Sequence, residues 1–158
     1  MAAGPPASLY HRIVTDSDSS VMSAADGGSA PGSLQLIQSF ANTRGAGSEQ
    51  DLLRTREEAA AWLRAAALLP AGGGLSNSEH AALLRLRESV RDVLAARAGG
   101  REDAGAAARL TRALADGRLV LTVDPAGTVR LASAARASYP NLVAAIAIAI
   151  AESAATSW

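Results

Sequence analysis

The 158-residue sequence contains no cysteine and only two histidines. Without cysteine the chain has no disulfide, no thiolate nucleophile and no thiolate metal site. His11 lies in a stretch rich in Gly, Ala, Ser and Asp, whereas His80 lies near an expected helix start, so the two do not suggest a shared metal site. The sequence therefore predicts neither a bound metal nor a cofactor.

Lysine is also absent, and all 15 basic residues are arginines. Fifteen acidic residues balance them, so the formal net charge is zero and the chain as a whole is not attracted to nucleic-acid phosphates. Arginine can bind phosphate through two hydrogen bonds, but an arginine-only composition with abundant Ala and Gly is also typical of a GC-biased genome. DNA binding would require a local patch of arginines.

Aromatic residues make up only 3% of the sequence, although hydrophobic residues make up 49%. The apolar residues are chiefly Ala, Leu and Val, and a core of such small side chains needs closely packed helices. The N-terminus has no basic region followed by an apolar run, so no secretory signal is predicted and we expect a cytoplasmic protein.

Composition divides the chain near residue 32. Residues 1–32 are rich in Gly, Ala, Ser, Asp and Pro, and we expect them to form a disordered or loosely docked tail. Residues 33–158 carry the periodic apolar patterns, and their length suits one domain. We predict that they form a mainly α domain of about five helices with one small β-hairpin.

Two helix starts are marked by capping residues. Thr55 followed by Glu57 and Glu58 predicts the first, because the hydroxyl can accept an orphan amide and the acids suit the positive end of a helix. Ser76 with Glu79 has the spacing of a capping box. The helix after Ser76 has an apolar stripe formed by Leu83, Leu86, Val90, Val93 and Leu94.

Residues 118–123 and 128–132 are rich in β-formers and flank the sequence Asp124-Pro125-Ala126-Gly127. This pattern predicts a hairpin. Because an isolated hairpin is marginally stable in water, we expect it to pack on the helices.

The last apolar run, residues 142–151, alternates like a strand at its isoleucines, yet Pro140 and the many alanines favour a helix. The run is shorter than the ~20 residues that span a bilayer, so we predict a buried helix and no membrane segment. If the domain does not cover this helix itself, its apolar surface is available for a homodimer or another protein partner.

Two sets of polar residues are candidate sites. Asn42, Thr43 and Arg44 follow the expected helix that begins at Leu34 and could hold a small ligand or anion; alternatively, Asn42 and Thr43 satisfy backbone groups at the helix end.

Arg85, Arg87 and Arg91 could contact nucleic-acid phosphates along one helix, but Glu88 and Asp92 beside them suit local ion pairs. No phosphate loop or nucleophile elbow is present, so we predict no catalytic residues and no enzyme.

These segments, taken in order, resemble the ABATE domain of stress-induced transcription regulators over about residues 33–155. The resemblance rests on Asn42-Thr43, on the Trp62-Leu63 pair and on Leu86-Arg87-Glu88. It implies a regulatory domain, either sensory or for protein interaction. A non-enzymatic domain that binds a small ligand is the alternative.

Members of this family usually continue into a C-terminal zinc-binding module with a Cys-Gly-Asn-Arg motif, which the resemblance implies as the DNA contact. The present sequence ends at Trp158 and has no cysteine. We therefore expect this chain to lack the zinc finger, and to bind DNA only weakly or through that missing module.

Overall fold

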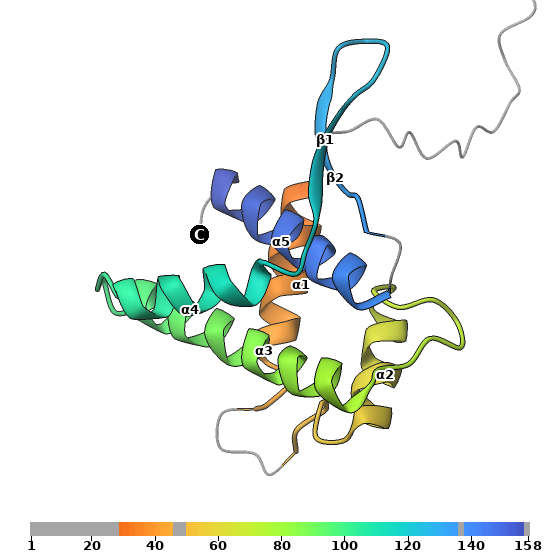
Figure 1. Ribbon diagram of the computed structural model, residues 1–158. Coiled ribbons are helices and arrows are strands. Elements are labelled where there is room, and N and C mark those ends of the chain that lie inside the picture. The colour runs from red at the N-terminus through yellow and green to blue at the C-terminus, as the bar shows by residue number, and fades with distance from the viewer. Residues whose placement is uncertain (1–28, 46–49, 136–137, 157–158) are drawn as a thin grey trace, which may run out of the picture.

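Five helices make up most of the chain that the computed structural model describes, namely residues 29–45, 50–135 and 138–156 (Figure 1). In order, the elements are α1 (Ser29–Ala41), α2 (Arg56–Ala65), α3 (Asn77–Ala98), α4 (Ala104–Leu114), β1 (Leu119–Val123), β2 (Val129–Ser133) and α5 (Ser138–Thr156). The predicted mainly α fold with one hairpin is confirmed. Most of the predicted tail, residues 1–28, lies outside the described residues.

Both predicted helix starts are formed, the capping box at Ser76 as predicted and a second capping box at Thr55. At the start of α2, the Glu58 amide donates to the Thr55 hydroxyl at 3.1 Å and the Thr55 amide donates to the Glu58 carboxylate at 3.0 Å. At the start of α3, Ser76 and Glu79 make the same reciprocal pair at 3.2 and 2.7 Å. Each box satisfies two amides that have no partner within the helix, which fixes where the helix begins.

Helices α3 and α4 lie side by side in opposite directions (Figure 1). Gly100 makes the reversal possible, because its φ of 63° is in the left-handed region that glycine adopts without steric cost. The Asp103 carboxylate then accepts from the Ala106 amide at 2.8 Å and caps α4. The two helices thereby form one face of the domain.

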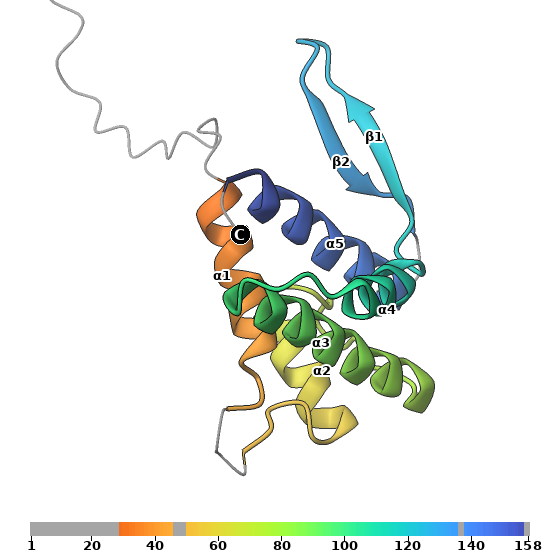
Figure 2. The ribbon, with the colours of Figure 1, turned by 90° about the vertical axis from the view of Figure 1, so that its left-hand side faces the viewer.

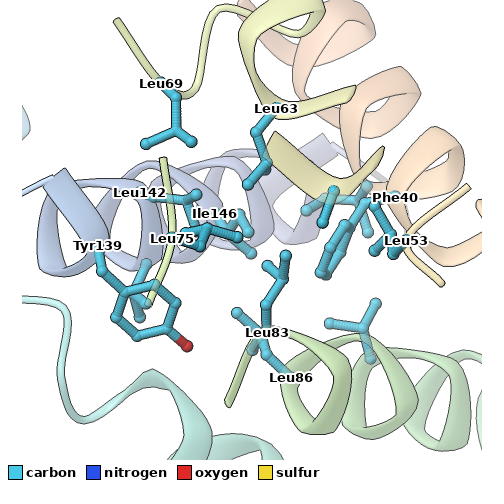
Figure 3. Close-up of a cluster of buried hydrophobic side chains, with 14 of the residues drawn as sticks. Phe40, Leu53, Leu63, Leu69, Leu75, Leu83, Leu86, Tyr139, Leu142 and Ile146 are labelled. Carbon is cyan, nitrogen blue, oxygen red and sulfur yellow. The ribbon is translucent and has the colours of Figure 1, made fainter. Parts of the chain in front are cut away.

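The hydrophobic core lies between α1, α2, α3 and α5 (Figure 3). Its largest fully buried side chains include Phe40, Leu53, Leu63, Leu86 and Ile146. The Phe40 ring lies against Trp62, with 5.9 Å between ring centroids. Burial of each such side chain contributes about 1.5–3 kcal/mol, so a core with few aromatics still provides the main driving force for folding.

The first and last described helices pack on each other: α5 passes over α1 in Figure 1, and the end of α5 meets the start of α1 in Figure 2. The buried hydroxyl of Ser33 in α1 donates to the carboxylate of Glu152 in α5. Gly117, just before β1, lies so close to α5 that a Cβ there would be 2.9 Å from the Ala144 backbone nitrogen. Segments far apart in the sequence thus meet on α5.

The C-terminal apolar run is a helix, as predicted. By length and composition, residues 138–155 are sufficient to cross a membrane, so the expectation that the run is too short was wrong on that criterion. Much of the apolar surface is used inside the domain, where Leu142, Val143 and Ile146 are fully buried. Ile148 and Ile150 remain partly exposed and Ala151 is exposed, so part of the expected partner surface on this helix is still open.

The hairpin has the predicted position and a regular antiparallel register, in which Leu121 lies opposite Leu131. The Asp124 carboxylate accepts from the amides of Thr128 and Ala126 at 3.0 and 2.9 Å, and Gly127 adopts a φ of 84° that closes the turn. The expectation that the hairpin packs on the helices holds only at its base, where β2 contacts α5. Only the end of β2 is partly buried, and the ribbon rises away from α5 (Figure 2).

Candidate functional site

The predicted ligand triplet lies where α1 ends. Thr43 is buried, and its hydroxyl donates to the Phe40 carbonyl at 2.8 Å. The backbone at Arg44 forms an isolated antiparallel β-bridge with the backbone at Asp51. The Leu52 amide donates to the Thr43 carbonyl at 2.8 Å. The Thr43 hydroxyl therefore serves the helix end. Asn42 is exposed and lines a shallow surface hollow, so ligand contact there stays a prediction.

Asp51 and Arg87 form a two-pronged ion pair beside this helix end. Arg87 Nη1 lies 2.5 Å from Asp51 Oδ1, and Nη2 lies 2.9 Å from Oδ2. The same carboxylate accepts from the Leu53 amide at 2.9 Å, while Arg87 Nε donates to Glu88 at 3.0 Å. The pair joins α3 to the segment before α2.

The ion pair also changes the acidity of both groups. The hydrogen bond from Arg87 lowers the pKa of Asp51, more than partial burial raises it. Burial disfavours the charged guanidinium, but the hydrogen bonds and charges of Asp51 and Glu88 together outweigh it and raise the pKa of Arg87. Both side chains are therefore charged at neutral pH, and the pair is a fixed structural element.

The three arginines predicted to face nucleic acid lie in three different environments. The Arg87 side chain is only 4% exposed, so it has no free surface for phosphate, and its inclusion in the predicted set was wrong. Arg91 Nη1 donates to the carbonyls of Ala41 and Arg44 at 2.9 and 2.8 Å and holds the end of α1. Arg85 is exposed. Together they do not form one basic surface.

Arg85 instead lines a groove of about 580 Å³ between α3, α4 and the start of α5. The apolar part of its wall includes Ala82, Leu84 and Ala113. The charged part has three basic and three acidic residues, namely Arg85, Arg109, Arg112, Glu88, Asp92 and Asp116. The groove is therefore amphipathic, with a balanced formal charge.

Some of these charges neutralise one another. Arg109 Nη2 lies 2.9 Å from Asp92 Oδ2 and links α4 to α3. Glu88 pairs with Arg87 and Arg91. Within the described residues, the side chains of Arg85 and Arg112 form no hydrogen bond or ion pair. Two guanidinium groups thus remain available to an anion.

Tyr139 contributes a hydroxyl to the same groove. Its ring extends from α5 at the edge of the buried cluster (Figure 3). Burial, with a smaller contribution from Asp116, raises its pKa to about 12, so the hydroxyl is neutral at physiological pH. It makes no hydrogen bond to any described residue. A neutral phenol in this position can donate to or accept from a bound molecule.

Metal-binding chemistry has no counterpart in the described ranges, where no group of three or more His, Asp or Glu side chains is placed to hold an ion. His80 Nε2 lies 2.8 Å from the Leu53 carbonyl, which fixes the ring against the backbone. His11 lies outside the described residues.

The groove residues Arg109, Arg112, Asp116 and Tyr139 were missed by the sequence predictions, because helix packing alone brings them together. The burial of Arg87 had a visible signal. It follows Leu83 by four residues and precedes Val90 by three, so it lies on the apolar stripe of α3.

These features define a small helical domain with an open amphipathic groove and a projecting hairpin. The sequence matches the family described as "ABATE: Putative stress-induced transcription regulator" over residues 34–157. The chain therefore belongs to the ABATE family, which confirms the resemblance noted from the sequence. No curated protein and no solved structure matches the chain.

Proposed function

We propose that this domain is the sensory part of a stress-induced transcription regulator, and that it binds a small anionic ligand in the groove between α3 and α4. The family assignment supports the regulatory role. The observation that carries ligand binding is the presence of two unpaired guanidinium groups, on Arg85 and Arg112, and a free phenol, on Tyr139, around one groove.

The groove favours a ligand with one acidic group and an apolar part. The acidic group would bind Arg85 or Arg112, because guanidinium and carboxylate or phosphate match in geometry and charge. The apolar part would lie on Leu84 and Ala113. Since three acids balance the three arginines of the wall, a polyanion such as DNA is not favoured there.

Binding without catalysis is the second part of the proposal. Ser89 is the one hydroxyl besides Tyr139 among the groove residues, and it donates to the Arg85 carbonyl at 2.8 Å rather than to a general base. A serine without a base beside it is a weak nucleophile. We infer that the groove holds its ligand unchanged.

DNA contact would then be made outside these 158 residues, which contain no cysteine for the zinc module found in the family. Arg85 is the only one of the three predicted arginines whose side chain has neither an ion pair nor a hydrogen bond within the described ranges. We expect feeble binding of duplex DNA by this chain. Tight and salt-sensitive binding, measured by fluorescence anisotropy, would contradict this expectation.

Ligand binding can be tested with benzoate and phenyl phosphate as probes, using isothermal titration calorimetry. We expect Arg112→Gln and Tyr139→Phe each to weaken binding about 10-fold, the effect of losing one charge-assisted hydrogen bond. Arg130→Gln removes an exposed arginine of the hairpin and is the matched control. If neither probe binds, or if the control weakens binding as much as Arg112→Gln does, the groove is not the ligand site.

A further inference from the structure

The hairpin presents one face that is apolar except for Ser133 at its base. Side chains that lie opposite each other in an antiparallel pair point to the same side, and successive residues alternate sides. The register pairs Leu121 with Leu131 and Val123 with Val129, and it places Leu119 opposite Ser133. Five large apolar side chains therefore share one face: Leu119, Leu121, Val123, Val129 and Leu131. We call it the apolar hairpin face.

This face is open to solvent. Its five large side chains are 38% to 68% exposed. Leu119 at the base of the hairpin is 39% exposed, whereas Val123 and Val129 beside the turn are 65% and 59% exposed. In the pair between them, Leu121 is 68% exposed and Leu131 is 38% exposed. Of the seven large hydrophobic residues that are exposed in the described ranges, six belong to the hairpin. Exposed apolar surface is therefore concentrated on this element.

The opposite face of the hairpin has a different character. It carries Thr122 and Arg130, which are paired in the register, together with Val120 and Ala132. The Thr122 hydroxyl donates to the Arg130 carbonyl at 3.3 Å. One face of the hairpin is thus suited to water, and the apolar hairpin face is suited to burial.

A two-stranded hairpin with an uncovered apolar face is marginally stable. The exposed area of the five side chains is on the order of 400 Å², which is within the range of the largest apolar patch on a typical monomer, and such patches are often functional. Two such faces packed together would bury about 800 Å², which is less than the ~1,200 Å² of a stable specific interface and in the range of weak, transient ones. The area therefore matches what a weak dimer needs.

We propose that a second copy of this chain covers the apolar hairpin face, with the two hairpins packed face to face about a two-fold axis. A two-fold interface uses the same patch twice, so that patch must be compatible with itself. The apolar hairpin face meets this condition because it contains no charged residue. The formal net charge of zero adds no long-range repulsion between copies. Packed in this way, four strands form a small sandwich.

The interface is separate from the ligand groove and does not depend on the proposed ligand. It also differs from the expected partner surface on α5, because the two surfaces lie on different elements of the domain. The hairpin and α5 can therefore be distinguished by substitution.

Sedimentation velocity over a concentration series tests the dimer. We expect the unmodified chain to dimerise reversibly and Leu121→Glu to weaken the dimer roughly 100-fold, since a carboxylate would be buried at the centre of the interface. Thr122→Glu introduces the same charge one residue away on the opposite face and should leave the dimer unchanged. A chain that is monomeric throughout the series, or equal effects of the two substitutions, would overturn the proposal.

Cross-linking tests the geometry without disturbing the core. Because the chain has no cysteine, Leu121→Cys and Thr122→Cys each provide a single thiol. With a short bis-maleimide, Leu121→Cys should give a cross-linked dimer and Thr122→Cys should not. Equal cross-linking would indicate edge-to-edge pairing of strands instead. Protection of the Leu121→Cys thiol from maleimide in a monomer would indicate cover by the chain's own residues, and both results would refute face-to-face packing.

Discussion

Replacing Asp51 with alanine should destabilise the domain strongly, because it leaves the Arg87 guanidinium buried without its two-pronged partner. Removal of one member of a buried ion pair typically costs 3–5 kcal/mol. Asp51 is 21% exposed, and Glu88 still accepts from Arg87 Nε, so we expect a value near the lower end, about 3 kcal/mol. A domain of this size would then melt roughly 10 °C lower.

Urea unfolding followed by circular dichroism measures this cost. Asp92→Ala is the matched control. Asp92 and Arg109 are 2.9 Å apart, the same distance as the longer of the two Asp51–Arg87 contacts, but both of their side chains are about half exposed. Exposed ion pairs contribute about 0.2–1 kcal/mol, so the control should lose little stability. Equal losses in the two variants would refute the argument that burial decides the value of the pair.

The same ion pair gives a pH dependence with a defined sign. Arg87 lowers the pKa of Asp51 in the folded state, so the pair stabilises the fold above the unfolded pKa of about 3.9 and loses this effect as the pH falls through the folded value. The stability of Asp51→Ala should therefore depend less on pH in this acidic range. A parallel decline in both proteins would mean that other carboxylates cause the acid sensitivity.

Three further substitutions or titrations test other parts of the structure. Gly117→Ala would place a Cβ against the α5 backbone and should cost about 1–3 kcal/mol in chemical denaturation, unlike Gly74→Ala, where the space is open. Ser76→Ala removes one capping hydroxyl and should cost about 1 kcal/mol, with Ser78→Ala as the control. Tyr139 should ionise near pH 12 in an ultraviolet titration. The stability that the buried neutral phenol contributes should fall as the pH rises above the unfolded pKa of about 10. Ionisation near pH 10 would show that the phenol is not buried.

Local signals were read correctly from the sequence, because their partners are close in the chain. Ser76 and Glu79 are three residues apart, so their spacing alone predicts a helix start. The start at Thr55 was predicted from its hydroxyl and the two acids just after it. The hairpin could be predicted in the same way, because its turn-forming residues lie directly between two β-rich runs. Such short-range patterns predict the type of each secondary-structure element and the order of the elements along the chain.

Long-range features could not be derived in the same way. Asp51 lies 36 residues from Arg87 and meets it only after α3 has packed on the segment before α2. The groove depends on how α3, α4 and the start of α5 are placed. The hairpin was expected on the helices because burial is favourable, yet its alternation showed only which residues share a face, not what covers them.

The contact between α1 and α5 has a consequence for how the chain folds during synthesis. Leu142, Val143 and Ile146 belong to the last described helix, but they fill a core begun by Phe40 in the first. While the ribosome is still making residues up to 135, that core has no side chains from α5. Contacts of such large sequence separation form late. We expect a nascent chain to keep its apolar surfaces exposed until α5 has emerged, which makes it a client for chaperones until then.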